Sequence, residues 1–220
     1  LSTIANVMTA PPMPFLPAEL HGKLILFAML IHAGDAETGE RAVTPFRKLA
    51  TPFADMLKPM KYPEIYPPEQ EGYHPVAVGR TMFVDSIDRS VAETILDHLK
   101  ASKDSIMAVA QLRVLGGAMA RVPVDATAFG HRKSRIMVNV AALYDKPEQK
   151  DAHETWATNF AAALRQRDGG AYVNFLADVD RAQIRAAYPG AIWDRLRQVK
   201  AKYDPTNLFC LNQNIPPSNE

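Results

Sequence analysis

Residues 202–217 read KYDPTNLFCLNQNIPP, a composition too constrained for a loose tail. The Asp204-Pro205 pair ends the preceding helix, because the residue before a proline is pushed out of the α region. The pair Leu208-Phe209 then supplies apolar anchors. The triplet Asn212-Gln213-Asn214 places three side-chain amides, each both donor and acceptor, next to one another. The stretch therefore predicts a strip that docks on a flat, polar partner, such as a cofactor ring.

Three further motifs precede this strip along the chain. They are Leu115-Gly116-Gly117-Ala118, Ala128-Phe129-Gly130-His131-Arg132 and Tyr172-Val173-Asn174-Phe175. In this order, and together with the closing strip, they resemble the double-glycine, aromatic-x-His-Arg, Tyr-x-Asn-aromatic and Asn-Gln-Asn-Ile-Pro-Pro elements of the berberine-bridge-enzyme-like, FAD-linked oxidases. The resemblance covers residues 112–217, about the second half of the chain. Cys210 stands where that family commonly has an arginine.

The order of apolar and polar segments predicts an α+β fold. Apolar runs or two-residue alternation favour strands, and apolar residues three and four apart favour helices. The resemblance implies an antiparallel β-sheet covered by helices on one face, as in the substrate domain of FAD-linked oxidases, with the other face over the flavin. The expected strands are His21–Ala33, Gly79–Asp85, Ser105–Leu115 and Arg135–Leu143, and the expected helices are Asp35–Ala50, one from Ser90, one between Pro147 and Gly169-Gly170, and Ile192–Lys202.

Two local patterns make finer predictions about these elements. The run His21–Ala33 is apolar throughout, which is typical of a strand buried on both faces. The tetrapeptide Ser90-Val91-Ala92-Glu93 has the form of a capping box, so Ser90 is the expected N-cap of its helix. In the helix Asp35–Ala50, the residues Val43, Phe46 and Leu49 have core-facing spacing.

Composition excludes several classes of protein. A net charge of +1 over 220 residues argues against a dedicated nucleic-acid surface. The longest apolar run, Leu24–Ile31, is far shorter than the roughly 20 residues of a membrane-spanning helix, so no membrane partner is expected. The single cysteine, Cys210, excludes an intramolecular disulfide framework and a cysteine-based metal cluster. No secretion signal is visible, and a cytoplasmic protein is the expectation.

The resemblance also implies a division of the chain and a missing part. Residues 1–165 would form the substrate-binding domain, and residues 166–220 a berberine-type segment that returns to an FAD-binding domain. The glycine-rich, phosphate-binding half of the family has no counterpart in this sequence. We therefore expect either a fragment of a longer protein or a chain whose FAD-binding domain is supplied in trans.

Tyr172 is the strongest candidate for a catalytic group. In the family the matching tyrosine lies near the flavin and is often assigned a part in proton abstraction. A phenol needs help from neighbouring cations or hydrogen bonds to act as a base. From the residues alone, a half-buried tyrosine bonded to the backbone is the alternative. Asn139 is the second candidate, because it interrupts an apolar strand and therefore faces either solvent or the substrate.

Four amides are candidates for contact with the cofactor. Asn174 would share a face with Tyr172 if the segment is extended, although an amide that ties down the C-terminal segment is equally compatible. Asn212, Gln213 and Asn214 are expected to approach the flavin, or to fasten the strip to the FAD-binding domain. The pair His131-Arg132 is interpreted as a hydrogen-bonding brace. No histidine spacing typical of a metal site occurs.

These observations predict part of an FAD-dependent oxidoreductase that oxidises an alcohol, sugar or similar small molecule by hydride transfer to flavin. The expected partners are an FAD-binding domain, in cis or in trans, and a small-molecule substrate, and a homodimer is left open. The alternative is an orphan, non-catalytic module that binds a ligand or a partner.

Overall fold

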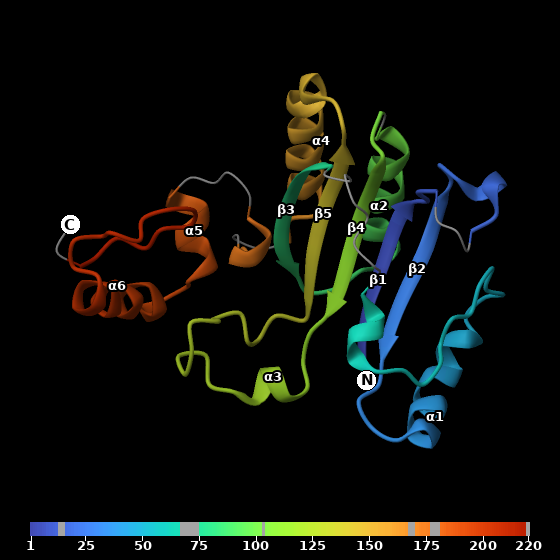
Figure 1. The fold of residues 1–220 in the computed structure, drawn as a ribbon, viewed down its shortest axis with the longest axis horizontal. Coiled ribbons are helices and arrows are strands. Elements are labelled where there is room, and N and C mark those ends of the chain that lie inside the picture. Colours follow the sequence, from blue (N-terminus) through green and yellow to red (C-terminus); the bar gives the residue numbers. More distant parts are fainter. Residues whose placement is uncertain (13–15, 67–74, 103, 167–169, 177–180, 219–220) are drawn as a thin grey trace.

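A computed structural model gives the fold of this protein. It describes residues 1–12, 16–66, 75–102, 104–166, 170–176 and 181–218. Gly169, expected to follow the long helix, lies outside the described residues. Figure 1 shows a central sheet with helices behind it, and a C-terminal helical unit to one side.

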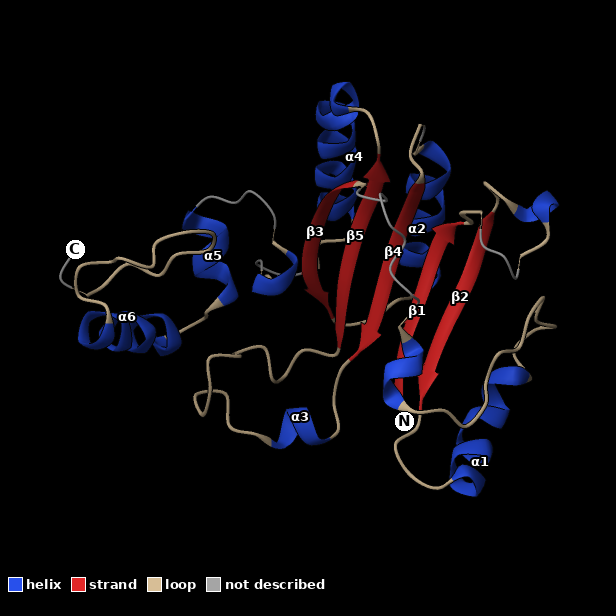
Figure 2. Cartoon of the chain, viewed as in Figure 1, coloured by secondary structure: helices blue, strands red, loops and turns tan. Residues whose placement is uncertain are grey.

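The centre of the molecule is a five-stranded sheet in the order β2-β1-β4-β5-β3. Every neighbouring pair is antiparallel. The strands are β1 (Ser2–Thr9), β2 (Leu24–Ile31), β3 (Val76–Val84), β4 (Met107–Val114) and β5 (Ile136–Tyr144). The sheet and its flanking helices, drawn in Figure 2, confirm the expected α+β class.

Two helices cover one face of the sheet, α2 (Arg89–Ala101) and α4 (Lys150–Ala163). Their apolar stripes pack on alternate residues of the strands, because successive side chains of a strand point to opposite faces. Leu99 and Phe160 from the helices meet Ala110 and Val138 from the strands in this core, all with no exposed surface. We call the opposite side of the sheet the polar face.

The remaining elements connect or extend this layer. Figure 1 places α1 beyond the end of β2, and α5 and α6 to the side of β3. The helices are α1 (Ala36–Arg47), α3 (Ala118–Arg121), α5 (Arg181–Ala187) and α6 (Ala191–Tyr203), and the 3-10 helices are η1 (Ala18–Leu20), η2 (Tyr62–Ile65), η3 (Pro147–Gln149) and η4 (Val173–Phe175).

The expectation of a strand buried on both faces is wrong for β2. This strand lies at the edge of the sheet, and Leu26 is 67% exposed. An apolar run identifies a strand but not how many neighbours cover it. In α1, Val43 is buried as expected, whereas Phe46 is exposed, because this helix lies beyond the sheet. Leu49 lies after the end of α1 and is also exposed.

The expected capping box at Ser90 is also wrong, because α2 begins at Arg89, two residues before the start that an N-cap at Ser90 would give. Asp88 is the N-cap, and its Oδ1 accepts a hydrogen bond from the backbone N–H of Val91 at 2.9 Å. Ser90 is exposed within the first turn. Asp88 and Ser90 are both residue types that commonly cap helices, and here the Asp88 carboxylate is the cap.

Replacement of the N-cap residue Asp88 should destabilise the protein, whereas replacement of Ser90 should not. We expect Asp88→Ala to lower the free energy of unfolding by about 1 kcal/mol, because a backbone N–H of α2 loses its acceptor. The matched control Ser90→Ala should change it by less than about 0.5 kcal/mol. Urea unfolding of the three proteins measures both values, and equal losses would contradict the cap assignment.

Candidate functional site

A row of polar side chains crosses the polar face of the sheet. Asn6 of β1 pairs with Gln111 of β4, Gln111 with Asn139 of β5, and Asn139 with Thr81 of β3. Because partners in register lie on the same face, these four side chains form one line across four strands. Three of them, Asn6, Thr81 and Asn139, are buried. We call these four residues the polar row.

Hydrogen bonds fix two members of the polar row. Asn6 Nδ2 donates to the carbonyl of Phe27 on the edge strand β2 at 3.0 Å. Asn139 Nδ2 donates to Gln111 Oε1 at 3.1 Å. The Nε2 group of Gln111 makes no hydrogen bond to any described residue, so it is left to donate to a ligand on this face. Asn139 thus faces the polar side of the sheet, in contact with a neighbouring amide.

Tyr172 is anchored at the end of the polar row. Its backbone N–H donates to Thr81 Oγ1 at 3.1 Å. The following residues form η4 rather than the expected extended segment, so the reasoning that placed Asn174 beside Tyr172 was wrong. The turn nevertheless brings the two together, and Asn174 Nδ2 donates to Tyr172 Oη at 3.0 Å. The phenol oxygen thus accepts a hydrogen bond while its own proton stays free to move.

Aromatic rings surround the Tyr172 phenol. Phe129 meets it edge to face, with ring centroids 6.0 Å apart, and Phe175 lies at 5.6 Å. The guanidinium carbon of Arg113, on β4, lies 4.7 Å from the centroid of the Phe175 ring. The site therefore combines one phenol, one cation and several amides in an apolar frame.

His131 belongs to the same frame. Its ring stacks on Phe83 of β3, with centroids 4.2 Å apart. Burial lowers the pKa of His131 below its ordinary value, and the nearby backbone of Ala187 and Ala186 partly opposes the shift. The imidazole is therefore neutral near pH 7 and serves as a flat packing surface.

The stability of the protein should depend on this histidine. Since its pKa is lower in the folded protein, the unfolded chain binds more protons, and stability falls as pH drops through the ordinary histidine value of about 6.5. It levels off below the folded pKa. We expect His131→Gln to lose less stability than the wild type between about pH 8 and pH 5 in thermal unfolding scans. Parallel curves would contradict the burial of a neutral His131.

Gly170 allows the chain to approach the His131 ring closely. A Cβ atom at this position would lie 2.6 Å from His131 Cε1 and 2.8 Å from Phe83 Cδ2, both in stacked rings that cannot move independently. We expect Gly170→Ala to destabilise the protein by about 1–3 kcal/mol. Gly79→Ala is the matched control, because its Cβ would meet neighbours at 3.5 Å or more. Denaturant unfolding that shows no difference between the two would contradict this close packing.

Arg132 is the brace that the sequence predicted. Its Nε donates to the carbonyl of Phe129 at 3.1 Å, its Nη2 to Thr127 Oγ1 at 2.7 Å and its Nη1 to the carbonyl of Met119 at 3.3 Å. These bonds hold the loop that carries Phe129 and His131. Arg132 therefore positions the aromatic frame.

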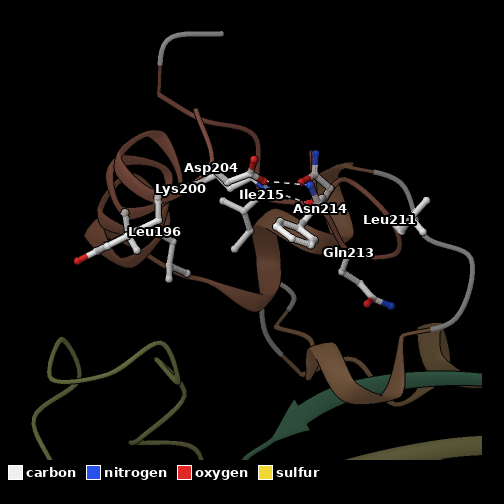
Figure 3. A pocket seen from close by; sticks show the side chains of 10 residues that line it. Leu196, Lys200, Asp204, Leu211, Gln213, Asn214 and Ile215 are labelled. Atoms are coloured by element: carbon white, nitrogen blue, oxygen red, sulfur yellow. Dashed lines mark hydrogen bonds and ion pairs between the residues drawn. The ribbon is translucent and has the colours of Figure 1, made fainter. Parts of the chain in front are cut away.

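The C-terminal strip forms a second, separate feature, shown in Figure 3. Asp204, at the end of α6, accepts hydrogen bonds from the backbone N–H groups of Leu208 and Phe209 at 2.8 and 3.0 Å, and pairs with Lys200. The hydrogen bond from Lys200 holds the pKa of Asp204 below its usual value. The start of the strip is thus held against the end of α6, and its docking on a cofactor or an FAD-binding domain stays a prediction.

Two of the three amides of the strip, Gln213 and Asn214, line a groove beside α6 rather than the polar row (Figure 3). Asn212 is exposed. Gln213 Nε2 donates to the carbonyl of Leu176, just after η4, at 2.8 Å. Asn214 Oδ1 is buried without a hydrogen-bond partner. Their contact with a cofactor stays a prediction.

The strip exposes large apolar side chains. Leu208, Phe209 and Leu211 are 74%, 78% and 84% exposed, and Tyr203 of α6 is 74% exposed. A cluster of this kind on a soluble domain marks a surface that contacts another protein part. Cys210 is exposed among them.

The described part of the chain lacks two features, a cluster of metal-binding side chains and a membrane-spanning helix. No group of three histidine, cysteine or acidic side chains is placed to hold a metal ion. No helix there is long and apolar enough to cross a membrane.

Comparison with known proteins finds one matching family model and several similar proteins. The family model "Berberine and berberine like" matches residues 171–216, which include η4 and the strip. The chain is 29% identical over 194 residues to an uncharacterized FAD-linked oxidoreductase, YgaK, of Bacillus subtilis, covering 87% of this chain and 40% of the relative. Residues 171–216 thus match a berberine-type domain, and the chain as a whole is similar to FAD-linked oxidoreductases of the berberine-bridge-enzyme-like family.

Two further relatives of this family extend the comparison. A xylooligosaccharide oxidase of Thermothelomyces thermophilus is 33% identical over 109 residues, covering 46% of this chain and 22% of the relative. The crystal structure of glycopeptide hexose oxidase DBV29, complexed with teicoplanin, shares the fold with a TM-score of 0.71 at 20% identity. That match covers 98% of this chain and 47% of the other. The chain thus spans less than half the length of these relatives.

The structure brings together some of the predicted site residues and adds others. Tyr172 and Asn174 are in contact, and Asn139 lies in the polar row beside the strand that anchors Tyr172. Sequence reasoning missed Gln111 and Arg113. Their alternation with Leu112 and Val114 placed them on one face, but strand pairing was needed to show that this face holds Asn139 and Tyr172.

Proposed function

We propose that this chain is the substrate-binding and C-terminal part of an FAD-dependent oxidoreductase that oxidises an alcohol, sugar or similar small molecule. The observation that carries the proposal is Tyr172, anchored through Thr81 at the end of the polar row, with its phenol oxygen bonded to Asn174. Residues 1–165 would form the substrate-binding domain. Residues 166–220 would return to an FAD-binding domain, in cis or in trans.

Residues of this chain fit part of an FAD molecule. The polar row and the Tyr172 phenol offer hydrogen-bonding groups on one sheet face, and the aromatic frame offers flat apolar surface. In the strip, the buried and unpaired Asn214 Oδ1 is an acceptor that a donor from outside the chain would satisfy. These groups suit the flavin ring and a substrate, so we assign the binding of the FAD diphosphate to the FAD-binding domain.

The bound flavin would accept a hydride from the substrate carbon. The role proposed for Tyr172 is to relay the hydroxyl proton of the same carbon: the phenol oxygen takes that proton as its own proton passes to solvent, so that the C–H and O–H bonds break as the C=O bond forms. Gln111 and Asn139 would hold neighbouring hydroxyls with their amides. Such a base must lie within hydrogen-bond reach of the proton that it takes, and a phenol oxygen that already accepts from Asn174 is held in one position for this.

A polyhydroxylated substrate is supported by the spacing of the polar row. Strands lie about 4.8 Å apart, so the amides of Gln111 and Asn139 offer two separate points at which hydroxyl groups of one substrate could be bound. One relative is named a xylooligosaccharide oxidase and a structural neighbour a hexose oxidase. We therefore prefer a carbohydrate or related polyol to a simple alcohol.

The test uses the full-length protein. We expect it to be purified with bound FAD, and the flavin to be bleached without oxygen by a carbohydrate alcohol. Asn139→Leu should raise the substrate concentration for half-maximal reduction about tenfold, because a hydroxyl loses its partner. Leu26→Ala, exposed at the far edge of the sheet, is the control. A full-length protein that binds no flavin would support an orphan binding module instead.

A further inference from the structure

Two tyrosines in the connection between α1 and β3 form a pair that the proposed chemistry does not use. Tyr62 begins η2, and Tyr66 follows its last residue. Their rings meet edge to face at 81°, with centroids 5.7 Å apart. A hydrogen bond of 2.9 Å joins the two hydroxyl oxygens. We call these two residues the tyrosine pair.

The tyrosine pair is exposed although its backbone is held in place. Tyr62 is 68% exposed and Tyr66 is 62% exposed, so neither ring packs in a core. The backbone N–H of Glu64 donates to the carbonyl of Lys61 at 3.0 Å, which closes the turn that carries the pair. The N–H of Tyr66 donates to the carbonyl of Pro63 at 3.3 Å, and the ring of Pro63 fixes one backbone angle at the start of η2. Two aromatic rings are thus kept in one arrangement while much of their surface stays open.

The tyrosine pair lies on the same side of the sheet as the polar row. Figure 1 draws η2, the turquoise turn beside the N-terminus, in front of β1, whereas α2 and α4 lie behind the sheet. The polar row runs from Thr81 of β3, which anchors Tyr172, to Asn6 of β1. The η2 turn is therefore at the end of the polar row that is far from Tyr172.

The length of the polar row exceeds one sugar ring. From β3 to β1 it crosses three strand intervals of about 4.8 Å each, or roughly 14 Å. In the proposed function the carbon that is oxidised lies beside Tyr172, at the β3 end. A monosaccharide held there does not reach β1, whereas an oligosaccharide extended along the polar row does.

The chemistry of the tyrosine pair suits a sugar ring. A sugar ring presents C–H groups on its faces and hydroxyl groups around its edge. The face of an aromatic ring carries negative charge density and attracts the slightly positive C–H hydrogens, and stacking also removes apolar surface from water. When two hydroxyls share one hydrogen bond, one O–H is left to donate and both oxygens keep lone pairs. The pair therefore offers both an aromatic surface and a hydroxyl rim.

We propose that the tyrosine pair is a second carbohydrate subsite, which stacks on a sugar ring of the substrate remote from the ring that is oxidised. The inference rests on the proposed carbohydrate substrate and adds that this substrate is an oligosaccharide. Tyr62 and Tyr66 touch no reacting atom in this arrangement, so they act on binding. They lower the half-saturating concentration of long substrates and leave the rate at saturation nearly unchanged, because the contact is the same before and during the reaction.

The experiment compares substrates of increasing length with the full-length protein. Anaerobic reduction of the flavin is measured with glucose, cellobiose and cellotriose, and with xylose and xylotriose. Tyr62→Ala combined with Tyr66→Ala should raise the half-saturating concentration of the trisaccharides about tenfold, because a stacking surface is lost. The half-saturating concentration of the monosaccharides should change by less than about twofold.

Two further variants serve as controls. Phe53→Ala removes another exposed aromatic ring, 78% exposed, from the same connection, and it should leave every half-saturating concentration unchanged. Tyr62→Phe combined with Tyr66→Phe keeps both ring faces and removes the hydroxyls. It should raise the trisaccharide value by about threefold, since only the hydrogen bonds to the sugar are lost. This variant replaces the double alanine variant if the latter does not fold.

A second readout is independent of turnover. The flavin is first reduced with dithionite, so that no sugar is oxidised, and the binding of cellotriose and xylotriose is measured by calorimetry. The double alanine variant should raise the dissociation constant of the trisaccharide that binds by about tenfold, in step with the kinetic value. An equal dissociation constant in the two proteins would overturn the subsite.

The outcomes separate this inference from the proposed function. Half-saturating concentrations that are the same for monosaccharides and trisaccharides would overturn the subsite and leave the proposed function intact. An equal rise for both substrate lengths in the double alanine variant, or a loss of bound FAD, would assign the pair another role and contradict the inference. Failure of every sugar to reduce the flavin would overturn the proposed carbohydrate substrate, and the calorimetry would then decide the subsite by itself.

Discussion

Tyr172→Phe should slow reduction of the bound flavin by about 100-fold or more, because loss of a positioned base typically costs 10²–10⁴ in rate. The variant removes one oxygen atom and keeps the ring that packs on Phe129 and Phe175. Flavin content and the thermal midpoint should stay close to those of the wild type. Stopped-flow reduction at saturating substrate, followed through the flavin absorbance, measures the effect.

Tyr188→Phe is the matched control. Tyr188 is a half-buried tyrosine that follows α5, packed against the small core of Ala171, Leu176 and Ala187. Burial raises the pKa of Tyr188 above its ordinary value, so its hydroxyl stays protonated near pH 7. Its removal should leave flavin reduction unchanged. Equal rates for wild type and Tyr172→Phe would show that another group takes the proton.

Replacement of exposed apolar residues of the C-terminal strip by charged ones should strongly lower the amount of FAD that the full-length protein binds. We expect Phe209→Asp combined with Leu211→Asp to lower the bound FAD per full-length protein at least tenfold. Both side chains are about four-fifths exposed in this chain, so the substitutions break no internal packing. They would instead place two charges in the predicted interface with the FAD-binding domain, where burial of an unpaired charge is costly.

Leu26→Asp is the control for this effect. Leu26 is also strongly exposed, on the edge strand β2 at the opposite end of the sheet from the C-terminal unit. It should leave the flavin content unchanged. The ratio of flavin absorbance to protein absorbance after gel filtration gives the measurement. Full flavin occupancy in the strip variant would mean that the FAD-binding domain docks elsewhere.

The helices of the fold could be predicted well from local pattern. Apolar residues spaced four apart, Ile95 and Leu99 in α2 and Phe160 and Leu164 in and just after α4, are the ones buried in the core. The strand β1 was missed, because Thr3 and Asn6 interrupt its apolar residues and no regular two-residue alternation results. The short helix α5 was also missed. Its seven residues span about two turns, too few for a clear period.

The site was predictable only where a motif marked it. Tyr172 and Asn174 were found through the resemblance, and Asn139 through its polar side chain in an apolar strand. The polar row was not predictable, because residues 6, 81, 111 and 139 are joined by strand register. A one-residue change in register would turn any of these strands over. The contact between Arg113 and Phe175 was not predictable for the same reason.

The most direct test of the central claim is a crystal structure of the full-length protein with FAD bound. We predict that the flavin ring faces the polar side of the sheet, with the Tyr172 oxygen and the Gln111 and Asn139 amides around the space next to its reactive edge. The strip should contact the FAD-binding domain. A flavin bound on the side of α2 and α4, or out of reach of Tyr172, would contradict this account.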